Sequence, residues 1–139
     1  MTSVQDTTTL LVFPPFCTPA SPSYSINYLS TFLTNNNIEN KVLDLNLKFH
    51  QLMFPDQYQY YKSFTNNYNL DEYNKITKDF QKISSQVYSK NNRGVINDEL
   101  PDLFNELLHE ITKYNPTTVA FSIVYSSQAF YSLVLIKEL

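Results

Sequence analysis

The sequence predicts an α/β fold, a partial flavodoxin-like (Rossmann-like) parallel sheet of three strands in the order 2-1-3. Two stretches carry this prediction, because residues 8–46 read as strand, helix and strand, and residues 117–139 read as strand and helix. Apolar runs that alternate with helical periodicity are typical of βαβ units, whose strands pair in parallel. A helical insertion is expected between the second and third strands.

The first strand, TTLLVF, is expected at the centre of the sheet. Its run from Leu10 to Phe13 is short, continuous and apolar, which favours a strand buried on both faces. Pro14 and Pro15 follow it and end the strand, because proline has no N–H to donate. Right-handed crossovers on both sides of this strand would cover its two faces, which gives the order 2-1-3.

A helix and the second strand come next. The run Asn35–Asn37 ends the helix, since Asn tolerates the left-handed conformation of a C-cap. The segment KVLDLN then forms the second strand, with Asp44 and Asn46 at its carboxyl end. We expect one stripe of the helix to cover the sheet: Ile26, Leu29, Phe32 and Leu33.

Helical periodicity dominates residues 45–114. One stripe precedes Pro55, and a second, at residues 73–87, belongs to a helix that Gly94 is expected to stop. Between them, residues 57–69 are polar and tyrosine-rich, and they carry no clear period. A third helix, Pro101–Tyr114, joins the third strand by a short turn, so we assign it as the βαβ crossover and place the insertion at about 47–98.

The third strand and the last helix occupy residues 117–139. The last helix carries neither Gly nor Asn as a C-cap, and the third strand would be left as an edge rich in β-forming residues. We therefore expect residues 1–139 to be the N-terminal part of one domain that is incomplete at its C-terminus. The isolated chain is expected to self-associate.

Composition argues against several classes of binding partner. The net charge is −3 and the lysines are scattered, so the chain has no basic stripe for nucleic acid. No apolar run is long enough to span a bilayer, and the first residues lack the positive charges of a signal peptide. The single cysteine is typical of a reducing compartment, so we expect a cytoplasmic protein without nucleic-acid or membrane partners. A glycine-rich phosphate loop is absent.

Polar residues at the strand ends are the candidates for a binding site, because α/β sheets bind ligands at the carboxyl ends of their strands. Each has a second interpretation as a helix cap or packing group. Asp44 and Asn46 can cap the helix that follows the second strand, and the serines after the third strand can do the same. His50 and His109 are expected to be packing or surface residues, and Cys17 an exposed, non-catalytic thiol.

Three segments together resemble a known family. LLVFPPFCTPASPSYSINYLSTFL, VLDLN and PTTVAFSIVYSSQAFYSLVLIKEL are similar to the N-terminal cobalamin-binding domain of B12-dependent radical S-adenosylmethionine enzymes. The resemblance implies a flavodoxin-like sheet that holds cobalamin at its strand ends. The residues that it assigns to cofactor binding are Pro14, Pro15, Phe16, Asp44, Asn46, Ser122, Tyr125 and Ser126.

The resemblance also implies the rest of the enzyme. A C-terminal catalytic domain with a CxxxCxxC motif would bind S-adenosylmethionine and a [4Fe–4S] cluster, which one cysteine cannot ligate. A peptide-modifying methyltransferase of ribosomal-peptide (RiPP) maturation fits best, with a peptide as substrate. The chain departs from the cobalamin signature D-x-H-x-x-G, because Asn46 stands where the histidine would be.

A different class of function is the alternative. The chain would then be a cofactor-free α/β binding module that recognises a peptide or partner protein through the tyrosine-rich helices of the insertion. Tyrosine supplies large amphipathic contact area at low entropic cost, which favours such a surface. The missing histidine and glycine of the cobalamin signature favour the module, whereas the strand-end polar residues favour cofactor binding.

Overall fold

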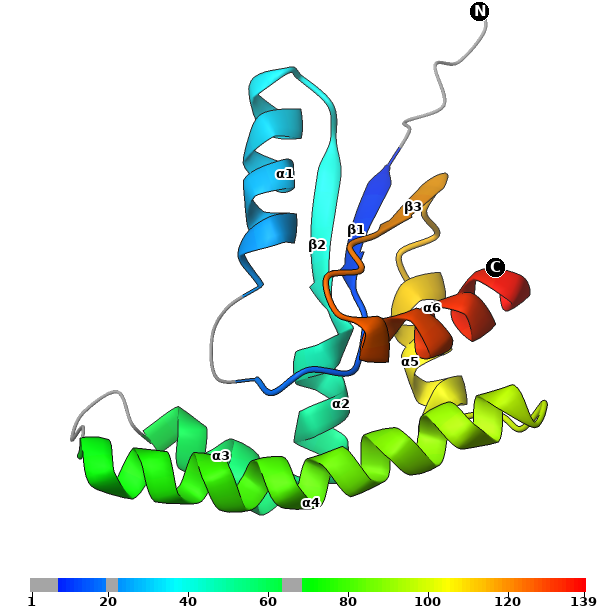
Figure 1. Ribbon diagram of the computed structural model, residues 1–139. Coiled ribbons are helices and arrows are strands. Elements are labelled where there is room, and N and C mark those ends of the chain that lie inside the picture. Colours follow the sequence, from blue (N-terminus) through cyan, green and yellow to red (C-terminus); the bar gives the residue numbers. More distant parts are fainter. Residues whose placement is uncertain (1–7, 20–22, 64–68) are drawn as a thin grey trace, which may run out of the picture.

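The computed structural model describes residues 8–19, 23–63 and 69–139 (Figure 1). The elements, in chain order, are β1 (Thr9–Phe13), α1 (Tyr24–Asn35), β2 (Asn40–Asp44), α2 (Leu45–Met53), α3 (Pro55–Ser63), α4 (Leu70–Ile96), α5 (Phe104–Thr112), β3 (Thr118–Phe121) and α6 (Ser126–Glu138).

The predicted sheet is confirmed. Its three strands are all parallel and lie in the order β2-β1-β3. Phe13 pairs with Asp44 of β2, and Val12 pairs with Phe121 of β3, so the three strands end at the same edge. The side chains of β1 are buried from Leu10 onward, as a central strand between two covered faces requires.

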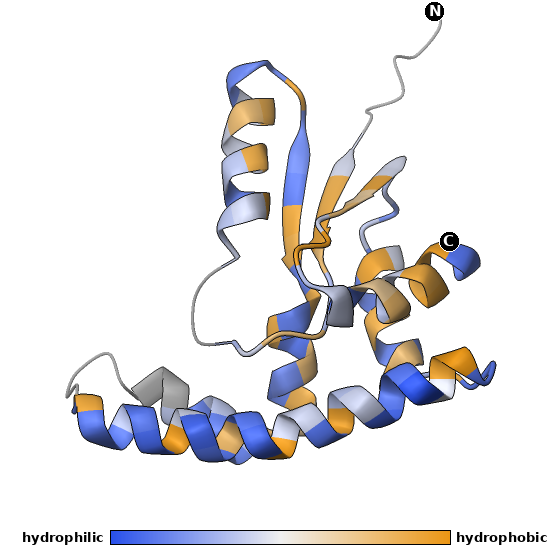
Figure 2. Ribbon diagram, in the orientation of Figure 1, coloured by the Kyte–Doolittle hydropathy of each residue, from blue (hydrophilic) through white to orange (hydrophobic). Residues whose placement is uncertain are grey.

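The two faces of the sheet are covered unequally. On one face α1 packs against β1 and β2 around a small cluster formed by Leu11, Phe13 and Ile26. On the other face β1 shares the main core with residues of α2, α4, α5 and α6. In Figure 2, β1 is apolar after its first residue, whereas α4 is mostly hydrophilic with apolar residues at intervals.

The predicted stripe of α1 is only partly right. Ile26 is buried and Leu33 packs against the small cluster, but Leu29 is 43% exposed and Phe32 is 57% exposed. A single helix over β1 and β2 contacts a narrow strip of side chains, so the rest of its apolar stripe faces solvent. Asn36 is the C-cap of α1, and Asn37 follows it with a φ of 58°, as expected of an Asn in the left-handed conformation.

The insertion begins directly at the end of β2. Leu45 and Asn46, predicted as strand, belong to α2 instead, because the Asp44 side chain caps that helix. Gly94 was expected to stop α4, but the helix continues to Ile96. The C-cap is Asn97, whose backbone N–H bonds to carbonyls of the last helical turn. Of the segment with no clear period, residues 64–68 lie outside the described residues.

Helix α4 lies beneath the carboxyl edge of the sheet (Figure 1). Two hydrogen bonds join α4 to the residues just before α5. The Asn91 side chain accepts from the Asp102 amide at 2.6 Å and donates to the Asp102 carboxylate at 3.1 Å. The Tyr131 hydroxyl of α6 donates to the Asp102 carbonyl at 2.8 Å. Within the described residues, no helix combines the length and apolar character that crossing a membrane requires.

Helix α5 fills the crossover position that the sequence predicts for it. Its apolar residues enter the same core as Leu10 and Val12 of β1, and only a short turn separates it from β3. The five residues of the predicted stripe all contribute to that core: Leu103, Phe104, Leu107, Leu108 and Ile111.

Leu107 provides a test of this packing. Its side chain is fully buried, so Leu107→Ala should lower the free energy of unfolding by about 2–5 kcal/mol. Leu133→Ala on α6 is the matched control, because Leu133 is 62% exposed, and it should cost less than about 1 kcal/mol. Urea unfolding followed by circular dichroism measures both, and equal losses would contradict the described core.

Candidate functional site at the ends of β1 and β3

A groove opens at the carboxyl ends of β1 and β3. Two adjoining hollows of about 320 Å³ and 190 Å³ form it, and both are lined by Cys17, Thr18 and Tyr125. The chain leaves β1 toward α1 on one face of the sheet and leaves β3 toward α6 on the other face, and open α/β sheets bind ligands between two such strand ends. The remaining lining residues of this strand-end groove are Phe13, Phe16, Ser23, Tyr24, Ser25, Tyr88, Val124 and Ser127.

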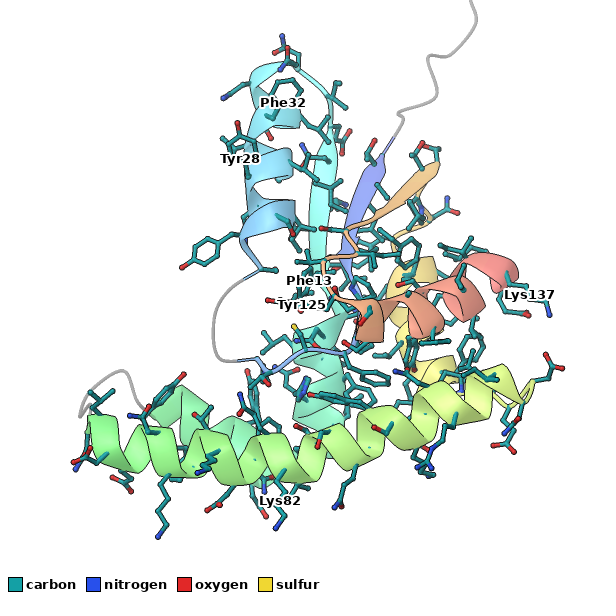
Figure 3. The ribbon with its side chains drawn as sticks, in the orientation of Figure 1. Phe13, Tyr28, Phe32, Lys82, Tyr125 and Lys137 are labelled. Atoms are coloured by element: carbon teal, nitrogen blue, oxygen red, sulfur yellow. The ribbon has the colours of Figure 1, made fainter. Side chains whose placement is uncertain are left out.

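Figure 3 shows Phe13 and Tyr125 together at this end of the sheet, whereas Tyr28 and Phe32 lie farther along α1. Tyr125 is 53% exposed although it lines both hollows, so its ring forms an open rim of the groove. Aromatic rings with a polar tip bind flat, partly apolar groups well.

The groove is built from uncharged segments. Residues 7–38 and 114–136 contain no Asp, Glu, Lys, Arg or His, and every lining residue except Tyr88 comes from these two stretches. The Asp44 carboxyl lies beside the groove, because it accepts a hydrogen bond from the lining residue Ser23. An anion therefore meets no cationic side chain among the lining residues.

Gln128 holds the two sides of the groove together, and sequence reasoning missed it. Its side chain is fully buried, its Nε2 donates to the Pro14 carbonyl at 2.7 Å, and its Oε1 accepts from the amides of Val124 and Tyr125 at 2.8 and 2.9 Å. The neighbouring Ser127 hydroxyl donates to the Phe16 carbonyl at 2.7 Å. A glutamine at the third position of a helix after a strand is the sequence signal that could have identified this cap.

Asp44 is the N-cap of α2. Its Oδ1 accepts from the Leu47 amide at 2.8 Å, and its Oδ2 accepts from the Ser23 hydroxyl at 3.1 Å. Burial raises the pKa of this carboxyl, and the hydrogen bonds from Leu47 and Ser23 oppose that shift. The geometry thus matches the capping interpretation, and a ligand role for Asp44 stays a prediction.

Asn46 is turned into the protein. It is buried in the first turn of α2, and its Oδ1 accepts from the Cys17 amide at 2.9 Å. This bond joins the loop after β1 to the insertion, so Asn46 shapes the groove without lining it. The side-chain oxygen that would contact a ligand is already occupied by the backbone of the neighbouring loop.

His50 and Tyr88 pack beneath the loop that follows β1 and contains Phe16 and Cys17. The buried His50 ring contacts the Asn46 carbonyl through Nδ1 and the Tyr88 hydroxyl through Nε2, and burial lowers its pKa to about 4. Tyr88 stacks on Phe16 with ring centroids 4.7 Å apart. His50 is therefore a core residue, which is one of the two positions, packing or surface, that the sequence predicts for it. The part that Tyr88 of α4 plays in the groove depends on a contact with Phe16 across 72 residues, which no local pattern signals.

The other sequence candidates take different positions. Pro14 and Pro15 are buried at the end of β1, and Phe16 lines the groove. Ser122 extends the ladder by donating its amide to the Val12 carbonyl, and its hydroxyl donates to Ser25 at 2.8 Å. Ser126 is exposed on the first turn of α6. The structure thus gathers these residues at one edge, and of them Phe16 and Tyr125 line the groove.

Within the described residues, no group of three or more His, Cys, Asp or Glu side chains could hold a metal ion. Comparison of the chain with family models, with curated proteins and with solved structures found no match.

Replacement of Asp44 tests its capping role. Asp44→Ala should cost about 1 kcal/mol of stability at neutral pH, whereas Asp44→Asn should retain the cap. Because the folded state raises this pKa above 3.8, the contribution of Asp44 to stability falls as the pH rises through the raised value. Melting temperatures across pH 3–8 should show Asp44→Asn gaining on the wild type as the pH rises. A constant difference would contradict a raised pKa.

Cys17 should be an unreactive thiol. Burial raises its pKa to about 12, and the Asp44 charge adds to that shift, which disfavours the nucleophilic thiolate. Iodoacetamide at pH 8 should modify the folded chain far more slowly than the chain in urea, and Asp44→Asn should react faster than the wild type. Mass spectrometry reads this directly because the chain has one cysteine. Equal rates in folded and unfolded chains would show that the thiol is freely accessible.

Proposed function

We propose that this chain is the N-terminal part of a cobalamin-binding domain from a B12-dependent radical S-adenosylmethionine enzyme, with the cofactor at the strand-end groove. The observation that carries the proposal is that two of the three segments that resemble this family line one groove at the β1/β3 switch point. The third segment contains Asp44, whose carboxylate accepts a hydrogen bond from Ser23 in the wall of the groove.

The chemistry of the groove supports this cofactor class. A corrin ring is large, flat and rimmed by uncharged carboxamides, and the groove offers aromatic rings, hydroxyls and carbonyls without a cationic side chain. Phe16, Thr18 and Tyr125 are the residues that would contact it. With about 320 Å³ in the larger hollow, the groove admits an edge of the ring and not the whole cofactor.

Asn46 does not fit the place of the cobalt-ligating histidine. Its side chain is buried, and its Oδ1 already accepts from the Cys17 amide. Cobalamin would therefore bind here without a protein ligand from this position. When bound, the cofactor supplies the methyl-transfer chemistry, and the residues of this chain supply orientation.

The remainder of the proposed enzyme follows from the same resemblance. S-adenosylmethionine and the [4Fe–4S] cluster would be bound by a C-terminal catalytic domain, and the substrate would be a peptide. The half-buried Tyr88 joins the insertion to the groove. The insertion would then serve the cofactor site in addition to any contact with the peptide.

The cofactor-free binding module remains the alternative proposal. It needs tyrosines of the insertion on the surface, but Tyr58, Tyr73 and Tyr88 are each half-buried. The Tyr58 hydroxyl accepts from Gln51 at 2.7 Å, and the Tyr88 hydroxyl contacts His50. The described tyrosines of the insertion therefore pack largely inside the protein, which favours the cofactor proposal.

A titration with hydroxocobalamin tests the proposal. The absorbance spectrum of the cofactor should change on binding to the chain, and Tyr125→Ala should weaken the affinity by about fivefold to tenfold because a stacking ring is lost. Tyr28→Ala is the matched control, since Tyr28 is 76% exposed and does not line the groove. An unchanged spectrum at saturating hydroxocobalamin would remove the cofactor proposal in favour of the binding module.

A further inference from the structure

Helix α1 carries large aromatic side chains on the side that faces away from the sheet. Tyr24, Tyr28 and Phe32 are 74%, 76% and 57% exposed, and Leu29 beside them is 43% exposed. Figure 3 shows Tyr28 and Phe32 along this helix. Residues four apart form a ridge on a helix, so the three aromatic side chains lie in one row, which we call the α1 aromatic row.

The α1 aromatic row lies in an uncharged stretch of the chain. Residues 7–38 contain no Asp, Glu, Lys, Arg or His, although the whole chain has a net charge of −3. A contiguous exposed apolar patch of this kind marks an interaction surface. Tyrosine and phenylalanine are enriched at the centre of protein interfaces, where charged residues are depleted. The row therefore has the composition of the middle of an interface.

The spacing of the row fits a second copy of the same row. Two α1 helices can pack antiparallel about a two-fold axis at Tyr28, so that Tyr28 meets Tyr28 of the other copy. Phe32 then meets the other copy's Tyr24, because both lie four residues from the axis. The row is thus complementary to itself when one copy is reversed.

Charge also favours a second copy as the occupant. Two copies with the same net charge repel each other unless they meet where neither carries charge, and the α1 aromatic row is such a place. The insertion and α5 carry most of the charged residues, and α2, α4 and α5 pack on the opposite face of the sheet. Pairing through α1 therefore keeps most like charges of the two copies apart.

The area of the row sets the strength of such a dimer. A buried aromatic side chain covers about 150–250 Å², so at these exposed fractions the row offers roughly 300–500 Å² per copy. Two copies together bury roughly twice that area, which is below the ~1,200–2,000 Å² of stable interfaces and typical of weak, reversible ones. We therefore expect a dissociation constant of about 10–100 µM.

The free edge of β3 is the competing surface for self-association. This strand has only four residues and Pro116 lies just before it, and short edges with a nearby proline resist pairing. The exposed apolar residues of α6, Leu133 and Ile136, share their helix with Lys137 and Glu138. An interface at β3 and α6 would therefore meet charges that the α1 aromatic row lacks.

We propose that two copies of this chain associate through the α1 aromatic row, as an antiparallel, two-fold symmetric helix pair centred on Tyr28. The proposal moves the expected site of self-association from the β3 edge to α1. It goes beyond the proposed function and does not depend on it, because the dimer is measured without cofactor.

Sedimentation equilibrium of the chain at about 5–500 µM tests the proposal. The wild type should be in reversible monomer–dimer equilibrium, and Tyr28→Glu should raise the dissociation constant at least about tenfold, because it places two carboxylates at the axis. Leu133→Glu is the matched control, since it adds the same charge at a residue of α6 that is 62% exposed, and it should leave the dimer unchanged. A wild type that stays monomeric, or a dimer that Leu133→Glu dissociates, would overturn the proposal.

A charge exchange tests the two-fold register. Tyr28→Lys should also prevent self-pairing, whereas an equimolar mixture of Tyr28→Lys and Tyr28→Glu should restore the dimer, because unlike charges then meet at the axis. Circular dichroism checks that each variant is folded, and Phe32→Glu mixed with Tyr24→Lys repeats the test at the outer contacts of the row. Mixtures of folded variants that remain monomeric would overturn the antiparallel pairing.

Discussion

The buried amide of Gln128 is the interaction on which the strand-end groove depends. One side chain bonds to the end of β1 and to the loop after β3, so it sets the distance between the two sides of the groove. A buried carboxamide costs free energy unless its donors and acceptor are satisfied, and here Pro14, Val124 and Tyr125 satisfy them. Without this bridge the loops would be joined at this edge mainly by the hydrogen bonds of the Ser127 and Ser122 side chains.

The chain divides its charges between two regions. The α/β elements around the groove lie in uncharged stretches, whereas the insertion and α5 carry most of the Lys, Asp and Glu. This division gives the groove a neutral character and leaves solvation to α4, whose outer side carries residues such as Lys82 (Figure 3). Asn46, His50 and Tyr88 then connect the charged insertion to the neutral edge through buried hydrogen bonds.

The sheet order and the crossover helix were predictable because they follow from periodicity and from the handedness of βαβ units. The continuous apolar run at Leu10–Phe13 could only be satisfied at the centre of a sheet. Too many residues of α1 were predicted to cover the sheet. Periodicity identifies which residues of a helix share an apolar face, but not how much of that face contacts the sheet. Phe32 illustrates this, as it has helical spacing and yet stays largely in solvent.

The order of amino acids alone specifies the elements, the strand order and the edge at which Phe16, Asp44 and Tyr125 gather, because all of these depend on local pattern and chain connectivity. It does not specify which polar side chains face the groove. Asn46 turns inward to the Cys17 amide, Gln128 joins two loops, and Tyr88 reaches Phe16 from a helix far along the chain. Those outcomes depend on which buried donors and acceptors find partners after packing, and that is decided only when the insertion closes against the sheet.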